Sequence, residues 1–355
     1  MNIKYQLASL LLSLYVPNLT VNSQANGAGA RCMQDMRCPK ESPCCNDVGF
    51  CGTDAVHCTL NCFPIGSFGD DTCKVPNPCK STKYDFTSGN VKTAELATFF
   101  GDNLDQVDFL TDGTVGKSDE GIVIKMPKGS KGGSRLLSTN FLLYGKVTAR
   151  MKTGRTGGVV TSFITMSNIK DEIDFEWVGK DVKSVQTNVF YRGQTDYTKG
   201  STNPVNSDTS QNFHDYTIDW SPDSIKWYVD GNLIRTYNKA DSLKQGTASY
   251  PSTPSRVEIA LWNGGSNAAG TREWAGGEVN WDSEDIKKQG YFSAVIASIE
   301  FQCSNTPFSN STKSSGSNTK SSSPSSSGNS NSSAQSFTYP ALLTAATAIG
   351  TYLLF

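Results

Sequence analysis

The stretch that decides the fold reads Asp171-Glu172-Ile173-Asp174-Phe175-Glu176-Trp177. Acidic and large apolar residues alternate in it. Successive side chains of a β-strand point to opposite faces, so this alternation predicts a strand with one face in a core. Glu172, Asp174 and Glu176 then share the other face, where three neighbouring carboxylates repel one another.

An ordinary solvated strand face is the alternative interpretation, but such a face normally mixes charges of both signs. Retaining glycoside cleavage would explain the neighbouring acids, because this reaction uses one carboxylate nucleophile and one protonated carboxyl about 5–5.5 Å apart. The Cα atoms of Glu172 and Glu176 lie roughly 13 Å apart along a strand, so their side chains must lean towards each other. Asp174 between them is expected to help separate their pKa values. The spacing does not say which glutamate is the nucleophile.

Short strand-like segments surround this stretch, and long helical periodicity is absent. The expected strands are 121–126, 144–152, 159–166, 186–191, 214–220, 225–229, 233–237, 257–262 and 295–301, with a hairpin turn at Asp230-Gly231. Many short strands in one large domain predict an all-β fold, a β-sandwich or jelly roll. We assign residues 64–303 to this catalytic domain.

Residues 171–179 resemble the signature of glycoside hydrolase family 16, in the form used by the fungal Crh cell-wall transglycosylases. The resemblance covers about residues 80–303 and includes segments 144–147, 213–231 and 262–277. It implies a β-jelly roll in which Glu172 is the nucleophile, Glu176 the acid/base and Asp174 the assisting residue.

The same resemblance implies contacts with the sugar substrate. They fall on Glu176, Trp262 and Thr271, and also on Glu258 and Trp274. Packing in the core is the alternative role for the tryptophans. We favour that role for Trp220 and Trp227, because they alternate with polar residues within predicted strands.

Residues 24–63 form a small cysteine-dense module with little apolar core, which needs disulfides for stability. A zinc site is the competing interpretation, but no C-x2-C pair occurs and the compartment is expected to be oxidising. The module resembles a hevein-type chitin-binding domain, and this resemblance implies the pairs Cys32–Cys45, Cys38–Cys51 and Cys44–Cys58. For the remaining cysteines we expect Cys73–Cys79 as a local loop and Cys62–Cys303 as a tie to the catalytic domain.

The sugar contacts of hevein-type domains fall on Asn46, Val48, Phe50 and His57 of this chain. Sugar stacking needs a flat apolar ring, and Phe50 alone offers one at these positions. A chitin-binding module and a purely structural module therefore both remain as interpretations.

The two ends of the chain carry targeting signals. Residues 1–23 are expected to be a secretory signal peptide, with a buried N-terminal helix as the alternative. Residues 304–331 form a Ser-rich, glycosylated stalk with an N-glycosylation site at Asn310. Residues 332–355 resemble a removable GPI-anchor signal with attachment at Asn331, and a membrane span is the alternative.

Composition limits the remaining function classes. The net charge of −1 provides no field that would attract nucleic acid or an anionic membrane. With His57 and His214 as the only histidines, a His-rich metal site is not expected. We predict no metal and no cofactor.

The predicted function is a secreted retaining enzyme that remodels the fungal cell wall. The family resemblance points to chitin as donor and to β-1,6-glucan, β-1,3-glucan or chitin as acceptor. A covalent glycosyl-enzyme can be released by a sugar hydroxyl as well as by water. A hydrolytic endo-β-glucanase or chitinase-like enzyme on the same fold is the alternative, and a non-catalytic wall lectin is the third hypothesis. We expect the protein to be secreted, GPI-anchored at the plasma membrane or linked to the wall, with no membrane contact except through the anchor.

Overall fold

The structure, a computed structural model, describes residues 29–305 apart from 34–35, 70, 75–76, 100–103 and 245–246. The predicted signal peptide and GPI segment lie outside these residues. So do Asn310, Asn331 and all of the predicted stalk except residues 304–305.

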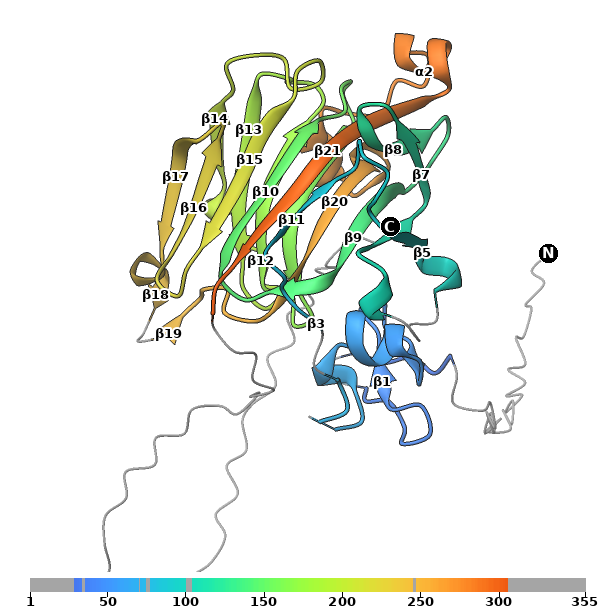
Figure 1. Ribbon diagram of the computed structural model, residues 1–355, viewed down its shortest axis with the longest axis vertical. Helices are drawn as coiled ribbons and strands as arrows, with labels where there is room; N and C mark the ends of the chain where they lie inside the picture. Colours follow the sequence, from blue (N-terminus) through green and yellow to red (C-terminus); the bar gives the residue numbers. More distant parts are fainter. Residues whose placement is uncertain are drawn as a thin grey trace, which may run out of the picture.

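Two largely antiparallel sheets packed face to face make up the body of the molecule, with parallel pairing at β3–β9 and β5–β6 (Figure 1). The eight-stranded sheet has the order β17-β16-β15-β10-β21-β8-β7, and β4 also pairs with β21. Its strands are β4 (Thr82–Asp85), β7 (Thr114–Ser118), β8 (Gly121–Pro127), β10 (Gly145–Lys152), β15 (His214–Trp220), β16 (Ser224–Val229), β17 (Asn232–Asn238) and β21 (Tyr291–Cys303).

The nine-stranded sheet has the order β14-β13-β12-β11-β20-β9-β6-β5, and β3 also pairs with β9. Its strands are β3 (Asn77–Pro78), β5 (Thr93–Glu95), β6 (Phe109–Asp112), β9 (Gly133–Leu142), β11 (Val159–Ser167), β12 (Glu172–Val178), β13 (Ser184–Phe190), β14 (Ser201–Pro204) and β20 (Ser255–Asn263). The predicted all-β jelly-roll sandwich is confirmed.

The remaining elements are short. Two-stranded ladders are formed by β1 (Cys44–Cys45) with β2 (Cys51–Gly52), and by β18 (Leu243–Lys244) with β19 (Thr247–Ala248). The α-helices of the described part are α1 (Ala269–Ala275) and α2 (Glu284–Gln289). A π-helical turn spans Val56–Leu60, and 3₁₀ turns span Pro64–Gly66, Leu96–Thr98, Leu104–Gln106, Tyr197–Lys199, Lys239–Ser242 and Gly264–Ser266.

The core lies between the two sheets, where the alternation of each strand directs its apolar side chains. Ile173, Phe175 and Trp177 of β12 are buried there, and Phe175 stacks between Phe163 and Trp177. The eight-stranded sheet contributes Trp220 and Trp227, which are also buried in this core. The core role predicted for these two tryptophans is confirmed.

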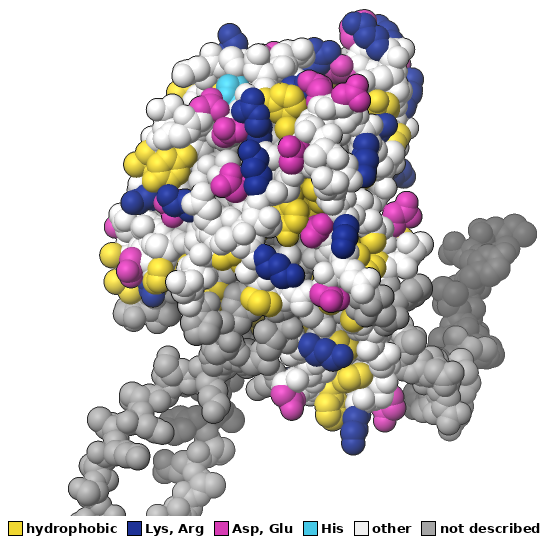
Figure 2. Space-filling view, viewed as in Figure 1, with side chains coloured by type: hydrophobic (Ala, Val, Ile, Leu, Met, Phe, Trp, Pro, Cys, Tyr) yellow, Lys and Arg dark blue, Asp and Glu magenta, His cyan; other side chains and the backbone are white. Residues whose placement is uncertain are grey.

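Outward-facing side chains of the eight-stranded sheet form ion pairs between strands β10 and β15. Lys146 pairs with Asp219 at 3.2 Å and Arg150 with Asp215 at 3.1 Å. Figure 2 shows acidic and basic side chains interspersed over this side of the molecule. Pairs as exposed as these contribute little to stability, typically below about 1 kcal/mol.

Five disulfides use all ten cysteines of the chain. The pairs Cys32–Cys45, Cys38–Cys51 and Cys44–Cys58 are confirmed. The predicted pairs Cys73–Cys79 and Cys62–Cys303 are wrong, because the structure pairs Cys62 with Cys73 and Cys79 with Cys303.

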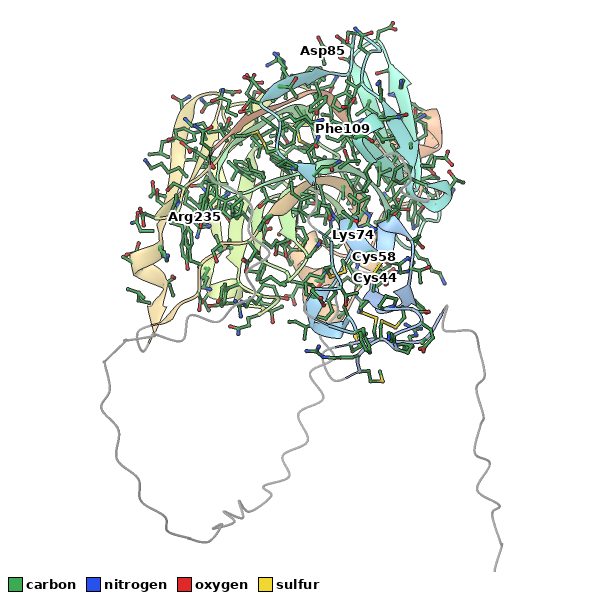
Figure 3. All side chains as sticks on the ribbon, turned by 60° about the horizontal axis from the view of Figure 1, so that its bottom comes forward. Cys44, Cys58, Lys74, Asp85, Phe109 and Arg235 are labelled. Atoms are coloured by element: carbon green, nitrogen blue, oxygen red, sulfur yellow. A yellow bond between two sulfur atoms is a disulfide. The ribbon has the colours of Figure 1, made fainter. Side chains whose placement is uncertain are left out.

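Strand pairing explains the corrected disulfides. β4 runs antiparallel to β21 with Thr82 opposite Phe301, so the residues just before β4 lie beside the end of β21. This places Cys79 against Cys303, the last residue of that strand. Cys62 then closes an 11-residue separation to Cys73 within the module. Because of this bridge, we call residues 29–73 the cysteine module from here on, beyond the predicted boundary at residue 63. The module lies at one end of the sandwich, in blue in Figure 1, and Figure 3 brings its Cys44 and Cys58 forward.

Candidate active site

Glu172, Asp174 and Glu176 lie on one face of β12, as predicted, and we call this side of the nine-stranded sheet the carboxylate face. Cross-strand register places Met166, Ile164 and Ser162 of β11 directly opposite the three acids. On the other side, Phe190, Asn188 and Gln186 of β13 take the equivalent positions. The acids therefore sit centrally in the sheet, with paired strands on both sides.

The backbone of β12 is braced at two points. Trp227 of the opposing sheet donates its indole N–H to the Asp174 carbonyl oxygen at 3.0 Å. Asp171, just before the strand, is almost fully buried and accepts bonds from the Ser252 and Arg192 backbone N–H groups and from the Thr253 hydroxyl, at 3.0, 3.1 and 2.8 Å. The alternating pattern of the strand gave no indication of this brace.

The middle acid, Asp174, is buried to 1% exposure. Its two carboxyl oxygens receive no hydrogen bond from any N–H group or hydroxyl of the described residues. Burial raises its pKa well above the usual value, and the charges of Glu172 and Glu176 add to this rise. These influences favour the protonated form of Asp174, and its interaction with the neighbouring Glu172 carboxyl lowers the pKa of Glu172.

The two glutamates are recessed but keep part of their surface accessible. Burial raises the pKa of Glu176 to about 8, and the nearby charge of Glu172 contributes. Burial also raises the pKa of Glu172, to about 7; Glu258 adds to this rise, whereas the Asp174 hydrogen bond and Lys170 oppose it. Glu172 thus has partners that stabilise its anion, and Glu176 is the glutamate that keeps its proton more strongly.

Trp262 and Trp274 lie together near the Glu176 end of β12. Trp262 is on the carboxylate face of β20 and 3% exposed, and its ring stacks with that of Trp274 at a centroid distance of 6.1 Å. Trp274 donates its indole N–H to the Gln186 side-chain oxygen at 2.8 Å, and Gln186 lies opposite Glu176. Thr271 is on the same short helix, α1, as Trp274.

Glu258 is on the carboxylate face but is already engaged by two guanidinium groups. It is 4% exposed and accepts bonds from Arg256 at 2.5 Å and from Arg135 at 3.5 Å. Opposed by burial, these charges hold its pKa below the usual value. Sequence reasoning named Glu258 and missed both arginines; the alternation of polar residues along β20 was the only signal for Arg256.

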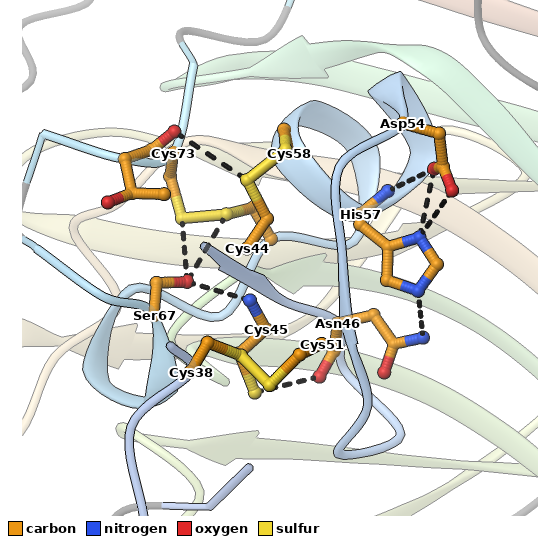
Figure 4. Close-up of a disulfide and its surroundings, with 12 residues drawn as sticks. Cys38, Cys44, Cys45, Asn46, Cys51, Asp54, His57, Cys58, Ser67 and Cys73 are labelled. Atoms are coloured by element: carbon orange, nitrogen blue, oxygen red, sulfur yellow. Dashed lines mark hydrogen bonds and ion pairs between the residues drawn. A yellow bond between two sulfur atoms is a disulfide. The ribbon is translucent and has the colours of Figure 1, made fainter. Parts of the chain in front are cut away.

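The hevein-like positions of the module are engaged within the module itself. His57 lies between Asp54, 2.8 Å from its Nδ1, and Asn46, 3.2 Å from its Nε2 (Figure 4). One face of the Phe50 ring is covered by the Arg31 guanidinium, 4.1 Å from the ring centroid. The ring predicted to stack on sugar is thus half-buried and covered on one face.

The cluster of Cys32, Cys38 and Cys45 cannot serve as a metal site. The sulfur atoms of Cys32, Cys38 and Cys45 lie within 4.8 Å of one another, but all three are in disulfides and are not thiolates. Within the part of the chain that the structure describes, no helix has the length and apolarity needed to cross a membrane. The carboxyl groups of β12 can supply one anion and one proton.

A protein-family model matches the part of the chain that bears these carboxyl groups. The model of glycosyl hydrolases family 16 matches residues 103–283, which include all of β12. The chain belongs to this family. The family assignment made from residues 171–179 is thereby confirmed.

Individual relatives are also similar over most of the chain. Crh-like protein 2 of Aspergillus fumigatus is 41% identical over 282 residues, 78% of this chain and 63% of the relative. Congo red hypersensitive protein 2 of Saccharomyces cerevisiae is 40% identical over 295 residues, 81% of this chain and 62% of the relative. The chain thus spans less than two thirds of the length of these two relatives.

A solved structure described as Crh5 transglycosylase in complex with NAG is similar in fold. The similarity has a TM-score of 0.54 at 31% sequence identity, and it covers 65% of this chain and 88% of that chain.

Proposed function

We propose that the chain is a retaining transglycosylase of the fungal cell wall, which cleaves chitin and transfers it to β-1,6-glucan, β-1,3-glucan or chitin. The row of carboxyl groups on β12 carries this proposal. Its two glutamates differ in how firmly they hold a proton, and that difference is what a double displacement requires.

In the first step the Glu172 carboxylate attacks the anomeric carbon of the donor chain, and an ester bond forms. The glycosidic C–O bond breaks, and Glu176 gives its proton to the departing oxygen. Glu176 suits this role because burial keeps it protonated near neutral pH. Asp174 donates a hydrogen bond to Glu172 and so favours the anion that attacks.

In the second step Glu176, now a carboxylate, accepts the proton of an incoming hydroxyl. The oxygen of that hydroxyl attacks the anomeric carbon, and Glu172 leaves as a carboxylate. A sugar hydroxyl gives a new glycosidic linkage, whereas water gives hydrolysis. The stacked pair Trp262 and Trp274, with Thr271 on the same helix as Trp274, is our candidate for holding the sugar beside Glu176, since flat apolar rings suit sugar faces.

The comparisons support transfer and a chitin-type donor. The solved relative is described as a transglycosylase bound to NAG, a sugar of the kind that builds chitin. We keep chitin binding by the hevein-like module as part of the proposal, with Phe50 as the candidate stacking ring.

We also retain the proposed route to the cell surface. It comprises secretion directed by residues 1–23, N-glycosylation at Asn310 and GPI attachment at Asn331, with an anchored or wall-linked mature protein. Release of the protein from intact cells by a GPI-specific phospholipase supports the anchor, and persistence on the cells after that treatment and after wall digestion argues against it.

An acceptor assay tests the activity. The protein is incubated with chitin oligomers and a labelled laminarin oligosaccharide, and products are separated by mass. We expect a labelled hybrid from the wild type and from Glu300→Gln, a glutamate on β21 of the other sheet, and none from Glu172→Gln. Free reducing ends without a hybrid would favour the hydrolytic endo-β-glucanase or chitinase-like alternative. Equal product formation by Glu172→Gln would exclude the proposed nucleophile, whereas binding without any product from the wild type would favour a non-catalytic lectin.

A further inference from the structure

The cysteine module is packed against the nine-stranded sheet by an apolar contact. Leu60, at the end of the π-helical turn of the module, is 1% exposed and packs with Leu110, Leu137 and Phe141 of β6 and β9. The side chain of Asn168, in the turn that leads into β12, donates to the Thr59 carbonyl oxygen at 3.3 Å. The module therefore touches the sheet close to the end of β12 that bears Glu172.

Arg256 forms the polar part of the same contact. It is 3% exposed, and its guanidinium donates to Asp47 of the module at 3.1 Å and to Glu258 of the sheet at 2.5 Å. It also donates to the Leu60 carbonyl oxygen at 2.9 Å and to the Asn61 side chain. One buried side chain thus holds two segments of the module and one strand of the catalytic sheet.

Register places this arginine close to the catalytic strand. Arg256 of β20 lies opposite Met166 of β11, which lies opposite Glu172 of β12, so the three share one row on the carboxylate face. The charges alternate from the module across the sheet. They run in the order Asp47, Arg256, Glu258, Arg135 and Asp112, with an Arg135–Asp112 pair at 3.0 Å.

The buried charged groups of this network stabilise one another's ionised forms. Burial opposes ionisation of Asp47, but Arg256 and Lys170 hold its pKa below the usual value, so it is charged at neutral pH. Removing one partner from a buried pair leaves the charge of the other uncompensated. The network therefore holds the module on the sheet, and its series of ion pairs extends from the module onto the carboxylate face.

We infer that the cysteine module is a fixed part of the catalytic centre, and that Arg256 is a positioning residue joining Asp47 of the module to Glu258 beside Glu172. The inference rests on the proposed function, because it assigns a catalytic consequence to the contact. It differs from the simple expectation that such a module is a separate sugar-binding head on the enzyme.

The consequence is electrostatic. The charged or titratable groups facing Glu172 are Asp174 and Glu176 on its own strand, Glu258 on β20 and Lys170 in the preceding turn. The negative charge of Glu258 disfavours ionisation of Glu172, and Arg256 compensates for part of that charge. Changing the network therefore changes the pH at which Glu172 becomes a nucleophile.

The test is the pH dependence of kcat/KM for transfer from chitin oligomers, measured on the whole secreted protein. The acidic limb of this profile reports ionisation of Glu172 in the free enzyme. We expect Glu258→Gln to move that limb to lower pH by about half a unit or more, and Arg256→Gln to move it to higher pH by a similar amount. Asp47→Asn is expected to move it in the same direction as Glu258→Gln but less. Glu41→Gln, an exposed acid of the same module, is the matched control and should leave the limb in place.

Opposite shifts separate a positioning role from a structural one, because simple loosening of the fold lowers activity without moving the limb in two directions. If Arg256→Gln does not fold, the double variant Asp47→Asn with Arg256→Gln keeps the net charge of the network. It should fold and still move the limb upward. Identical limbs in all variants that fold would overturn the inference, whereas a wild type without any Glu172-dependent activity would overturn the proposed function instead.

Discussion

Replacing Glu172 by Gln removes the neighbouring charge from Glu176 and leaves the burial of Glu176 unchanged. The pKa of Glu176 is raised from 4.5 to about 8, with burial as the larger cause and the Glu172 charge as the smaller. The total rise is about 3.5 units, so more than half of it should persist in the variant. We therefore expect Glu176 in Glu172→Gln to titrate above about 6 but below the wild-type value of about 8.

This rise determines what fraction of the Glu176 carboxyl is protonated at neutral pH. At pH 7 a carboxyl group with a pKa of about 8 is about 90% protonated, whereas one at 4.5 is about 0.3% protonated. The raised pKa thus increases the protonated form about 300-fold. Most of this gain comes from the recessed position of Glu176, so it should survive loss of its partner.

Carbon-13 NMR titration of glutamate side-chain carboxyls measures the pKa directly and needs no activity. The resonance absent from Glu176→Gln identifies the group, and Glu300→Gln on the opposite sheet serves as the control variant. A value near 4.5 in Glu172→Gln would refute burial as the main cause. A value still at 8 would refute any electrostatic interaction between the two glutamates across Asp174.

Four further changes test the site and the fold. Glu176→Gln should melt above the wild type at pH 8 and together with it at pH 4 in calorimetry, because a carboxyl with a raised folded-state pKa costs stability as pH rises from about 4.5 to about 8; equal melting at pH 8 would contradict the raised pKa. Asp171→Ala should lower the free energy of unfolding by about 1–3 kcal/mol in urea, because it leaves three part-buried hydrogen-bond donors without their acceptor; an unchanged midpoint would show that these bonds do not brace the strand. The double variant Cys79→Ser with Cys303→Ser should lower the free energy of unfolding by about 2–5 kcal/mol in the same assay. An unchanged free energy of unfolding would show that this disulfide adds no stability. Trp274→Phe should raise KM by losing the bond to Gln186 while kcat changes less; unchanged kinetics would place Trp274 outside the sugar site.

Local patterns in the sequence predicted the strands and the faces of β12. A two-residue repeat fixes which side chains share a face, because the pleat of a strand depends only on its own backbone. Glu172, Asp174 and Glu176 were therefore placed together correctly, and Trp220 and Trp227 were placed in the core. The first three disulfides followed from resemblance and were also correct.

Tertiary structure decided whatever depends on two distant segments meeting. Cys79 reaches Cys303 because β4 pairs with β21 across a separation of 224 residues, and no spacing along the chain contains that register. Arg256 meets Asp47 because the module docks on the carboxylate face, and Asp171 meets Thr253 through the loop before β20. The influences on the pKa values of the two glutamates likewise include burial and charged neighbours on other segments. Alternation is set by local sterics, whereas desolvation and charge pairing exist only after the chain has closed on itself.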